Sequence, residues 1–192
     1  MKYILRRYFA YGFIFLILAF AGMLAFSRFT PARADLHFRL TDHRGRIVTE
    51  KDFSGSSSLV FFGYTRCPTI CPLTLARLSE VQEKLAGQRQ KINILFITLD
   101  PAHDTPEVMK QYLAHFPAKI TGLTGPHEKL EPVYKALDVY PGHMDGRTAP
   151  DHSGFVFLAD GRGHFRAHFT AQMSVKKMTH LITETINREK DA

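Results

Sequence analysis

Two apolar segments of strand length, residues 59–65 (LVFFGYT) and 92–100 (INILFITLD), restrict the fold more than any other feature of this 192-residue chain. Each is apolar over most of its length, which is the pattern of a strand buried on both faces of a central sheet. A helix is predicted between them, from Pro72 to a stop at Gly87. Buried strands connected through a helix pair in parallel, so the sequence predicts an α/β fold.

The segments around this core complete the element order. Two hairpins are expected, over residues 36–50 and 154–169. Three further helices are expected, over about residues 105–115, 126–137 and 174–188. The resulting order of hairpin, strand, helix, strand, two helices, hairpin and helix is the thioredoxin-like arrangement with an N-terminal β-hairpin. The reactive site of that arrangement lies where the first core strand meets the first helix.

Residues 8–26 contain no charged side chain, and as a helix they would span about 28 Å, close to the thickness of a bilayer's hydrocarbon core. Lys2, Arg6 and Arg7 precede them, so the positive-inside rule keeps the first residues in the cytoplasm. A cleaved signal peptide is the alternative, because residues 32–34 have the A-x-A form of a cleavage site. The apolar run exceeds the usual signal core, so we expect residues 1–34 to form one transmembrane helix with a linker. Residues 35–192 would then be a single exported domain.

The positive charge of the chain is concentrated in this N-terminal segment. Five of the 25 basic residues and none of the 18 acidic residues lie in residues 1–34. The exported domain therefore carries 20 basic and 18 acidic residues and no block of like charges. This composition argues against nucleic-acid binding.

Both cysteines, Cys67 and Cys71, lie at the expected strand–helix junction, in the segment GYTRCPTICP. If this CxxxC segment coils toward the helix, the two sulfurs come close enough to clamp a metal ion or to form a disulfide. The helix N-terminus and Arg66 are both expected to lower the thiol pKa values, and Pro72 suits the first helical position. A purely structural disulfide is disfavoured, because so short a loop restrains the unfolded chain little.

A third ligand would make the cysteine pair a copper site. A closed zinc site needs four ligands and no second cysteine pair exists, whereas two thiolates and one further soft or borderline ligand suit Cu(I). The best placed of the ten histidines is His152, just before the strand that opens the second hairpin, with Asp151 available to orient its ring. His143 and Met144 are a weaker soft pair nearby in the sequence.

Three blocks of the sequence resemble, in the same order, the signature blocks of the Sco/SenC proteins. They are GYTRCPTICPLTL, ITLDPAHDTPEVM followed by GLTG, and DHSGFVFLADGRGHF. The resemblance implies a membrane-anchored, thioredoxin-like copper protein that assists the assembly of cytochrome c oxidase. The copper ligands of that family, two motif cysteines and the DHS histidine, correspond to Cys67, Cys71 and His152.

The resemblance also implies partners and a location. Copper or electrons would go to the CuA centre of cytochrome c oxidase subunit II, with another copper chaperone or a thiol reductase as further partners. The location would be the bacterial inner membrane with the domain in the periplasm, rather than the intermembrane-space side of the mitochondrial inner membrane. Many family members have Arg where this chain has His103, which puts a partner contact or an acidic-loop pairing there in doubt. Asp100 and Asp104 are expected to serve helix capping and loop structure.

Two functions stay open at this point. A metallochaperone, which is not an enzyme, would bind copper through the three ligands. A thiol–disulfide oxidoreductase would use the same dithiol to keep the oxidase cysteines reduced, without needing His152. A peroxiredoxin-type peroxidase is disfavoured because Tyr64 and Pro68, not Thr or Ser, stand three residues before the cysteines. Ser153 lies in no G-x-S-x-G elbow, and the chain has no P-loop or dinucleotide fingerprint.

Overall fold

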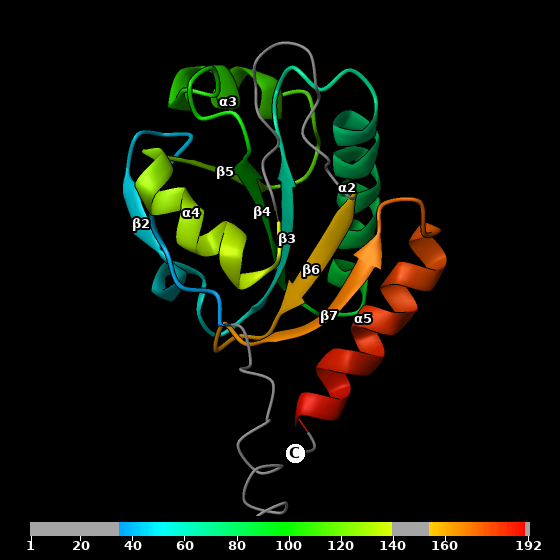
Figure 1. The fold of residues 1–192 in the computed structure, drawn as a ribbon. Coiled ribbons are helices and arrows are strands. Elements are labelled where there is room, and N and C mark those ends of the chain that lie inside the picture. Colours follow the sequence, from blue (N-terminus) through cyan, green and yellow to red (C-terminus); the bar gives the residue numbers. More distant parts are fainter. Residues whose placement is uncertain (1–34, 140–153, 191–192) are drawn as a thin grey trace, which may run out of the picture. The chain divides into compact units, whose positions relative to one another are not determined.

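The computed structural model describes residues 35–139 and 154–190, which form a seven-stranded sheet with helices on both faces (Figure 1). The strand order is β2-β1-β5-β4-β3-β6-β7. In chain order the elements are β1 (Arg39–Asp42), β2 (Ile47–Thr49), the 3-10 helix η1 (Glu50–Phe53), β3 (Ser57–Gly63), α2 (Ile70–Gly87), β4 (Ile92–Thr98), α3 (Pro106–Leu113), β5 (Ile120–Thr124), α4 (His127–Ala136), β6 (Phe155–Ala159), β7 (Phe165–Thr170) and α5 (Val175–Lys190).

The centre of the sheet is parallel and its two sides are antiparallel. Strand β4 pairs in parallel with β3 on one side and with β5 on the other. The hairpin β1–β2 joins β5 antiparallel, and the hairpin β6–β7 joins β3 antiparallel. The α/β, thioredoxin-like fold class with an N-terminal hairpin is thereby confirmed.

Strand β3 is buried over all seven residues because helices cover both faces of the sheet. Leu59 and Phe61 belong to the core formed with α2, α3 and α5, whereas Val60 and Phe62 belong to the core formed with α4. Helix α2 contributes a fully buried apolar stripe, Leu75, Leu78, Val81 and Leu85. The continuous apolar run in the sequence therefore reflects two cores on opposite faces of one strand.

Strand β5 was not predicted, and the expectation of two consecutive helices after β4 is wrong. Only Ile120 and Leu123 are apolar in its sequence, ITGLT, so the pattern gave no strand signal. Strand β5 forms because β4 and β1 pair with it on either side. A side-chain carbon on Gly122 would lie 2.7 Å from Leu113 and 2.9 Å from Met109, so the glycine allows α3 to pack closely on β5.

The first helix begins earlier than the sequence predicts. Helix α2 starts at Ile70, two residues before the expected Pro72, so the proline is the third helical residue. The start of α3 agrees with the prediction, since Pro106 is its first residue and the Thr105 hydroxyl accepts a hydrogen bond from the Val108 N–H at 3.3 Å. The earlier start of α2 brings Cys71 into the first helical turn.

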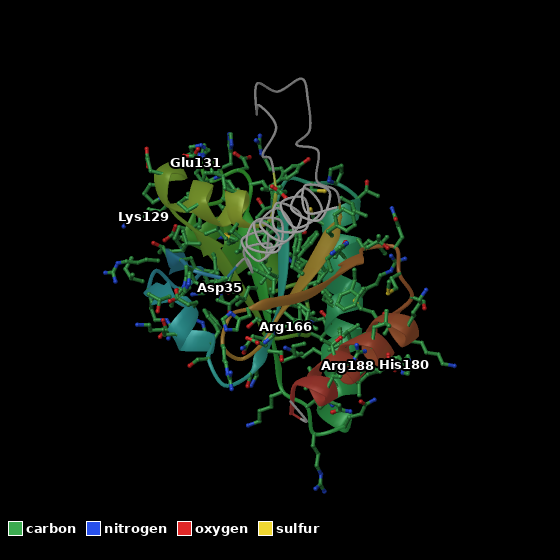
Figure 2. The ribbon with its side chains drawn as sticks, turned by 60° about the horizontal axis from the view of Figure 1, so that its bottom comes forward. Asp35, Lys129, Glu131, Arg166, His180 and Arg188 are labelled. Atoms are coloured by element: carbon green, nitrogen blue, oxygen red, sulfur yellow. The ribbon has the colours of Figure 1, made fainter. Side chains whose placement is uncertain are left out.

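An aspartate builds the turn in each of the two hairpins, as their sequences predict. Asp42 Oδ1 accepts hydrogen bonds from the N–H groups of Arg44 and Arg46, at 2.8 and 2.9 Å. Asp160 Oδ1 plays the same part in the β6–β7 turn, and Asp160 Oδ2 pairs at 2.5 Å with Arg166, which is labelled in Figure 2. These hydrogen bonds between an aspartate side chain and the following backbone N–H groups fix the turn in both hairpins.

The described residues contain no helix that is both long and apolar enough to cross a membrane. Residues 8–26, where such a helix is predicted from the sequence, lie outside the described part of the chain. The membrane anchor therefore stays a prediction.

Replacing Gly122 tests the packing of α3 on β5. Gly122→Val is expected to destabilise the fold by about 2 kcal/mol, because its methyl groups would enter space held by Leu113 and Met109. Gly87→Ala is the matched control: it places a carbon at the end of α2 with no atom within 4 Å, and should leave stability equal or slightly higher. Urea unfolding measures both, and equal stability of Gly122→Val and wild type would contradict this packing.

Candidate functional site

The two cysteines lie together where β3 passes into α2. Cys67 is in the connecting loop and Cys71 is in the first turn of the helix; both are buried, and they are not joined in a disulfide. The Cys71 N–H donates a hydrogen bond to the Cys67 sulfur over 3.4 Å. The CxxxC segment thus coils as predicted, and it brings the Cys67 sulfur against the first helical turn, which carries Cys71.

The expected activation of the thiols is wrong for Cys71. Burial raises the pKa of Cys71 strongly, and a hydrogen bond with the backbone of Tyr64 opposes this only in part. The guanidinium of Arg66 does not supply the expected charge, because it forms an ion pair with Asp100 at 2.6 Å. Desolvation therefore outweighs the helix N-terminus, and Cys71 is held as a neutral thiol.

Gly63, the last residue of β3, makes room for the Cys71 sulfur. A side-chain carbon at Gly63 would lie 2.7 Å from Cys71 Sγ and 2.8 Å from the Phe96 ring. Neither neighbour can move away easily, since both are fully buried in one core. The glycine lets the thiol pack directly against the end of the strand.

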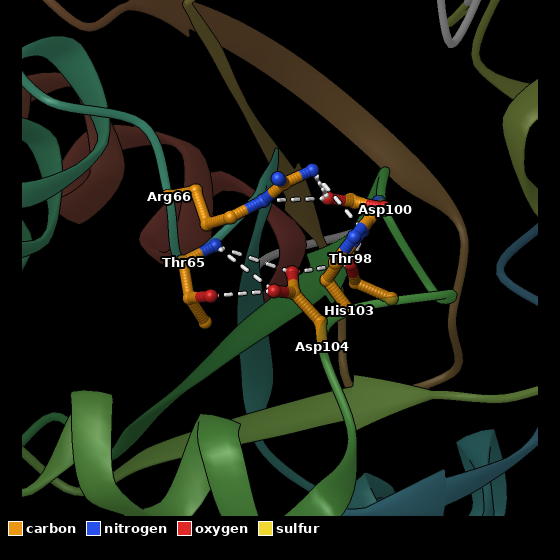
Figure 3. Close-up of polar contacts among 6 residues, drawn as sticks. All are labelled: Thr65, Arg66, Thr98, Asp100, His103 and Asp104. Atoms are coloured by element: carbon orange, nitrogen blue, oxygen red, sulfur yellow. Dashed lines mark hydrogen bonds and ion pairs between the residues drawn. The ribbon is translucent and has the colours of Figure 1, made fainter. Parts of the chain in front are cut away.

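Asp104 ties the cysteine loop to the sheet (Figure 3). Its carboxylate is fully buried and accepts hydrogen bonds from the Thr65 hydroxyl at 2.6 Å, the Thr65 N–H at 3.2 Å and the Thr98 hydroxyl at 2.5 Å. Burial raises the pKa of Asp104, while the hydrogen bonds from Thr65 and Thr98 lower it in part. Of the two roles expected for Asp104, helix capping is wrong, because Thr105 caps α3, and loop structure is confirmed, because Asp104 joins the loops after β3 and β4.

A second group of polar side chains, Arg66, Asp100 and His103, lies beside the hydrogen bonds of Asp104 (Figure 3). Asp100 is paired through one carboxylate oxygen with Arg66 at 2.6 Å and through the other with His103 Nδ1 at 2.9 Å. Burial alone would raise the pKa of Asp100, but its hydrogen bonds with His103 and Arg66 hold it below the usual value. The pairing with the acidic loop is therefore retained with histidine at position 103. The Arg66 and His103 side chains are each 55% exposed and open to a partner.

The predicted third ligand, His152, and the auxiliary pair His143 and Met144 lie outside the described residues. Within the described ranges, no group of three or more Cys, His, Asp and Glu side chains is arranged to hold a metal ion. Gly154, the first residue described after residue 139, lies near the cysteine motif. A side-chain carbon on Gly154 would lie 3.8 Å from Ile70, the residue before Cys71. His152 is two residues from this glycine in the sequence.

A sheet with a parallel centre and two cysteines, not joined in a disulfide, at the junction of β3 and α2 define the chain as a thioredoxin-like dithiol protein. Residues 28–187 match the family SCO1/SenC, and the chain belongs to that family. The SCO2-like protein of Rickettsia felis is 38% identical over 152 residues, covering 76% of this chain and 73% of that protein. Protein sco1 of Schizosaccharomyces pombe is 41% identical over 137 residues, covering 67% of this chain and 51% of that protein.

Two solved structures that are described with copper bound share the fold. Yeast Sco1 superposes with a TM-score of 0.72 at 34% identity, covering 80% of this chain and 88% of that one. ScoI of Bradyrhizobium japonicum superposes with a TM-score of 0.68 at 34% identity, covering 79% of this chain and 98% of that one. These relatives support the thioredoxin-like fold class and the Sco/SenC resemblance.

Removing the charge of Asp104 tests its hold on the cysteine loop. Asp104→Asn replaces one carboxylate oxygen, a hydrogen-bond acceptor, with an NH2 group, which is a donor. Because this donor would face the donors of Thr65 and Thr98, the substitution is expected to destabilise the fold by about 2 kcal/mol. The Thr65 amide should exchange its hydrogen faster by at least tenfold. Asp138→Asn, an exposed position with a left-handed backbone that asparagine tolerates, is the control. Unchanged Thr65 exchange in Asp104→Asn would contradict the assignment.

Proposed function

We propose that this chain is a copper metallochaperone that binds Cu(I) through Cys67, Cys71 and His152 and supplies it to the CuA centre of cytochrome c oxidase subunit II. The observation that carries the proposal is the pair of buried cysteines, not joined in a disulfide and linked by the Cys71 N–H, in a chain of the SCO1/SenC family. The copper-bound relatives of the same fold support the choice of metal. Relatives named as mitochondrial SCO2 proteins, from Saccharomyces cerevisiae and Bos taurus, support membership of the same family.

The donor set fits Cu(I) chemically. Two sulfurs and an imidazole are soft and borderline ligands, and Cu(I) accepts such a small set. Because burial holds Cys71 as a neutral thiol, binding of the cation would release its proton and leave a neutralised thiolate in the core. The Cys71 N–H directed at Cys67 Sγ would stabilise charge on the first sulfur.

Delivery would proceed by exchange of ligands with the partner. Cysteine thiolates of subunit II would displace Cys67 and Cys71 in turn, with His152 the first ligand to leave. Arg66 and His103, exposed on the same loops, offer the partner a polar contact next to the dithiol. We place the domain in the periplasm, held at the inner membrane by a transmembrane helix of residues 8–26. Another copper chaperone would load the domain with copper, or a thiol reductase would reduce its cysteines.

A thiol–disulfide oxidoreductase is the second candidate, supported by the same two neighbouring cysteines. One thiolate would attack a disulfide of subunit II to form a mixed disulfide, and the second would resolve it. Cys67 and Cys71 would be oxidised to a disulfide while the partner gains two thiols. This chemistry needs no third ligand, so His152 separates the two functions.

A competitive Cu(I) titration of the reduced full-length chain in detergent micelles tests the proposal. Wild type is expected to bind one Cu(I) tightly, the double variant Cys67→Ser/Cys71→Ser to lose binding, and His152→Ala to bind at least tenfold more weakly while still reducing disulfides. His180→Ala, an exposed histidine on α5, is the matched control and should bind as wild type does. A wild-type chain that reduces disulfides but fails to compete with a moderate chelator would overturn the copper function in favour of the oxidoreductase.

A further inference from the structure

Helices α2 and α5 form a surface groove of about 460 Å³. The two helices pack side by side on one face of the sheet, and their apolar residues belong to one core (Figure 1). The groove lies far from the dithiol, because Lys84 follows Cys71 on the same helix by about 20 Å along its axis. Its lining comes from the end of α2 and from α5: Lys84, Gln88, Lys176, Thr179, His180 and Thr183.

The groove carries positive charge from both helices. Lys84 and Lys176 are exposed, and their ammonium groups form no ion pair or hydrogen bond within the described ranges. The described residues that line the groove include no acidic side chain. His180, labelled in Figure 2, faces its own acid, since its Nε2 lies 3.8 Å from Glu184. The two unpaired lysines therefore give the groove a net attraction for anions.

The uncharged groups of the groove supply further hydrogen-bond donors. The carboxamide oxygen of Gln88 accepts a hydrogen bond from the Thr183 hydroxyl at 3.1 Å. This contact leaves the Gln88 NH2 group as a donor. Both helices thus present donors to the same small space, which suits a ligand with several acceptor oxygens.

Thr179 adds a hydroxyl that packing does not explain. Its side chain is 6% exposed and lines the groove, and its buried oxygen has no hydrogen-bond partner among the described residues. Three other helical hydroxyls, those of Thr74, Ser79 and Thr185, each donate to the carbonyl four residues earlier. A valine would fill the same volume, whereas a buried hydroxyl without a partner destabilises the fold. Rotation about the Cα–Cβ bond turns this hydroxyl toward a ligand in the groove.

We propose that the groove between α2 and α5 is a binding site for a phosphate group, held by the ammonium groups of Lys84 and Lys176 and by the Thr179 hydroxyl. A phosphate monoester carries up to about two negative charges and three strong acceptor oxygens, so it can meet donors from both helices at once. A carboxylate, with one charge and two oxygens, matches two ammonium groups less well. Soluble phosphate and the headgroup of an anionic phospholipid share this chemistry. The inference does not depend on the copper function.

A titration of the reduced full-length chain with inorganic phosphate tests the inference, in neutral detergent micelles and a phosphate-free buffer. The NMR amide signals of residues 176–183 are expected to shift and to saturate. The dissociation constant should rise about tenfold or more in Lys84→Gln/Lys176→Gln. Thr179→Val keeps the shape but loses the hydroxyl, so it should bind about fivefold more weakly and melt at a higher temperature without ligand. Thr179→Ser keeps the hydroxyl and should retain the affinity.

Lys110→Gln/Lys129→Gln is the matched control, because it removes two exposed lysine charges outside the groove. It should bind phosphate as wild type does. A second titration uses micelles containing phosphatidylglycerol, with zwitterionic phosphatidylcholine as its control. Shifts with free phosphate assign the site to soluble phosphates, and shifts with phosphatidylglycerol alone assign it to a lipid headgroup. The inference would be overturned if neither ligand moved these signals, or if the two double-lysine variants bound equally well.

Discussion

The candidate site depends on the hydrogen bonds to one buried carboxylate. Asp104 accepts from Thr65, which follows β3, and from Thr98, which ends β4, so the ends of two neighbouring parallel strands are held as one unit. Cys67 stands two residues after Thr65, and its position is therefore fixed by the sheet as well as by its own loop. The Asp100 pairings with Arg66 and His103 join the same two loops again at the surface, where a partner would dock.

Burial determines the protonation state of the Cys71 thiol. In water a thiol at a helix N-terminus would ionise more readily, but the loss of hydration at Cys71 is the larger effect and keeps it neutral. A thiolate in such a core needs a positive charge or hydrogen-bond donors close by. A bound soft cation would supply the first. The same core that stabilises the fold thus favours a sulfur bound to metal over a free thiolate.

The sequence predicts those features that arise from local patterns. Continuous apolar runs predicted β3 and β4, Thr105 predicted the start of α3, and the spacing of the cysteines predicted that their side chains come close together. Strand β5 was missed because its residues, ITGLT, become a strand through pairing with β4 and β1 and through the room that Gly122 gives α3. The pKa direction of Cys71 and the hydrogen-bond partners of Asp104 were missed because they depend on segments distant in sequence.

X-ray absorption at the copper edge of the Cu(I)-loaded full-length chain tests the central claim most directly, because it reports the atoms bound to the metal. The account predicts two sulfur ligands and one imidazole nitrogen in wild type, with the imidazole contribution lost in His152→Ala and the sulfurs kept. A wild-type copper shell without sulfur, or one whose imidazole contribution survives in His152→Ala, would contradict it.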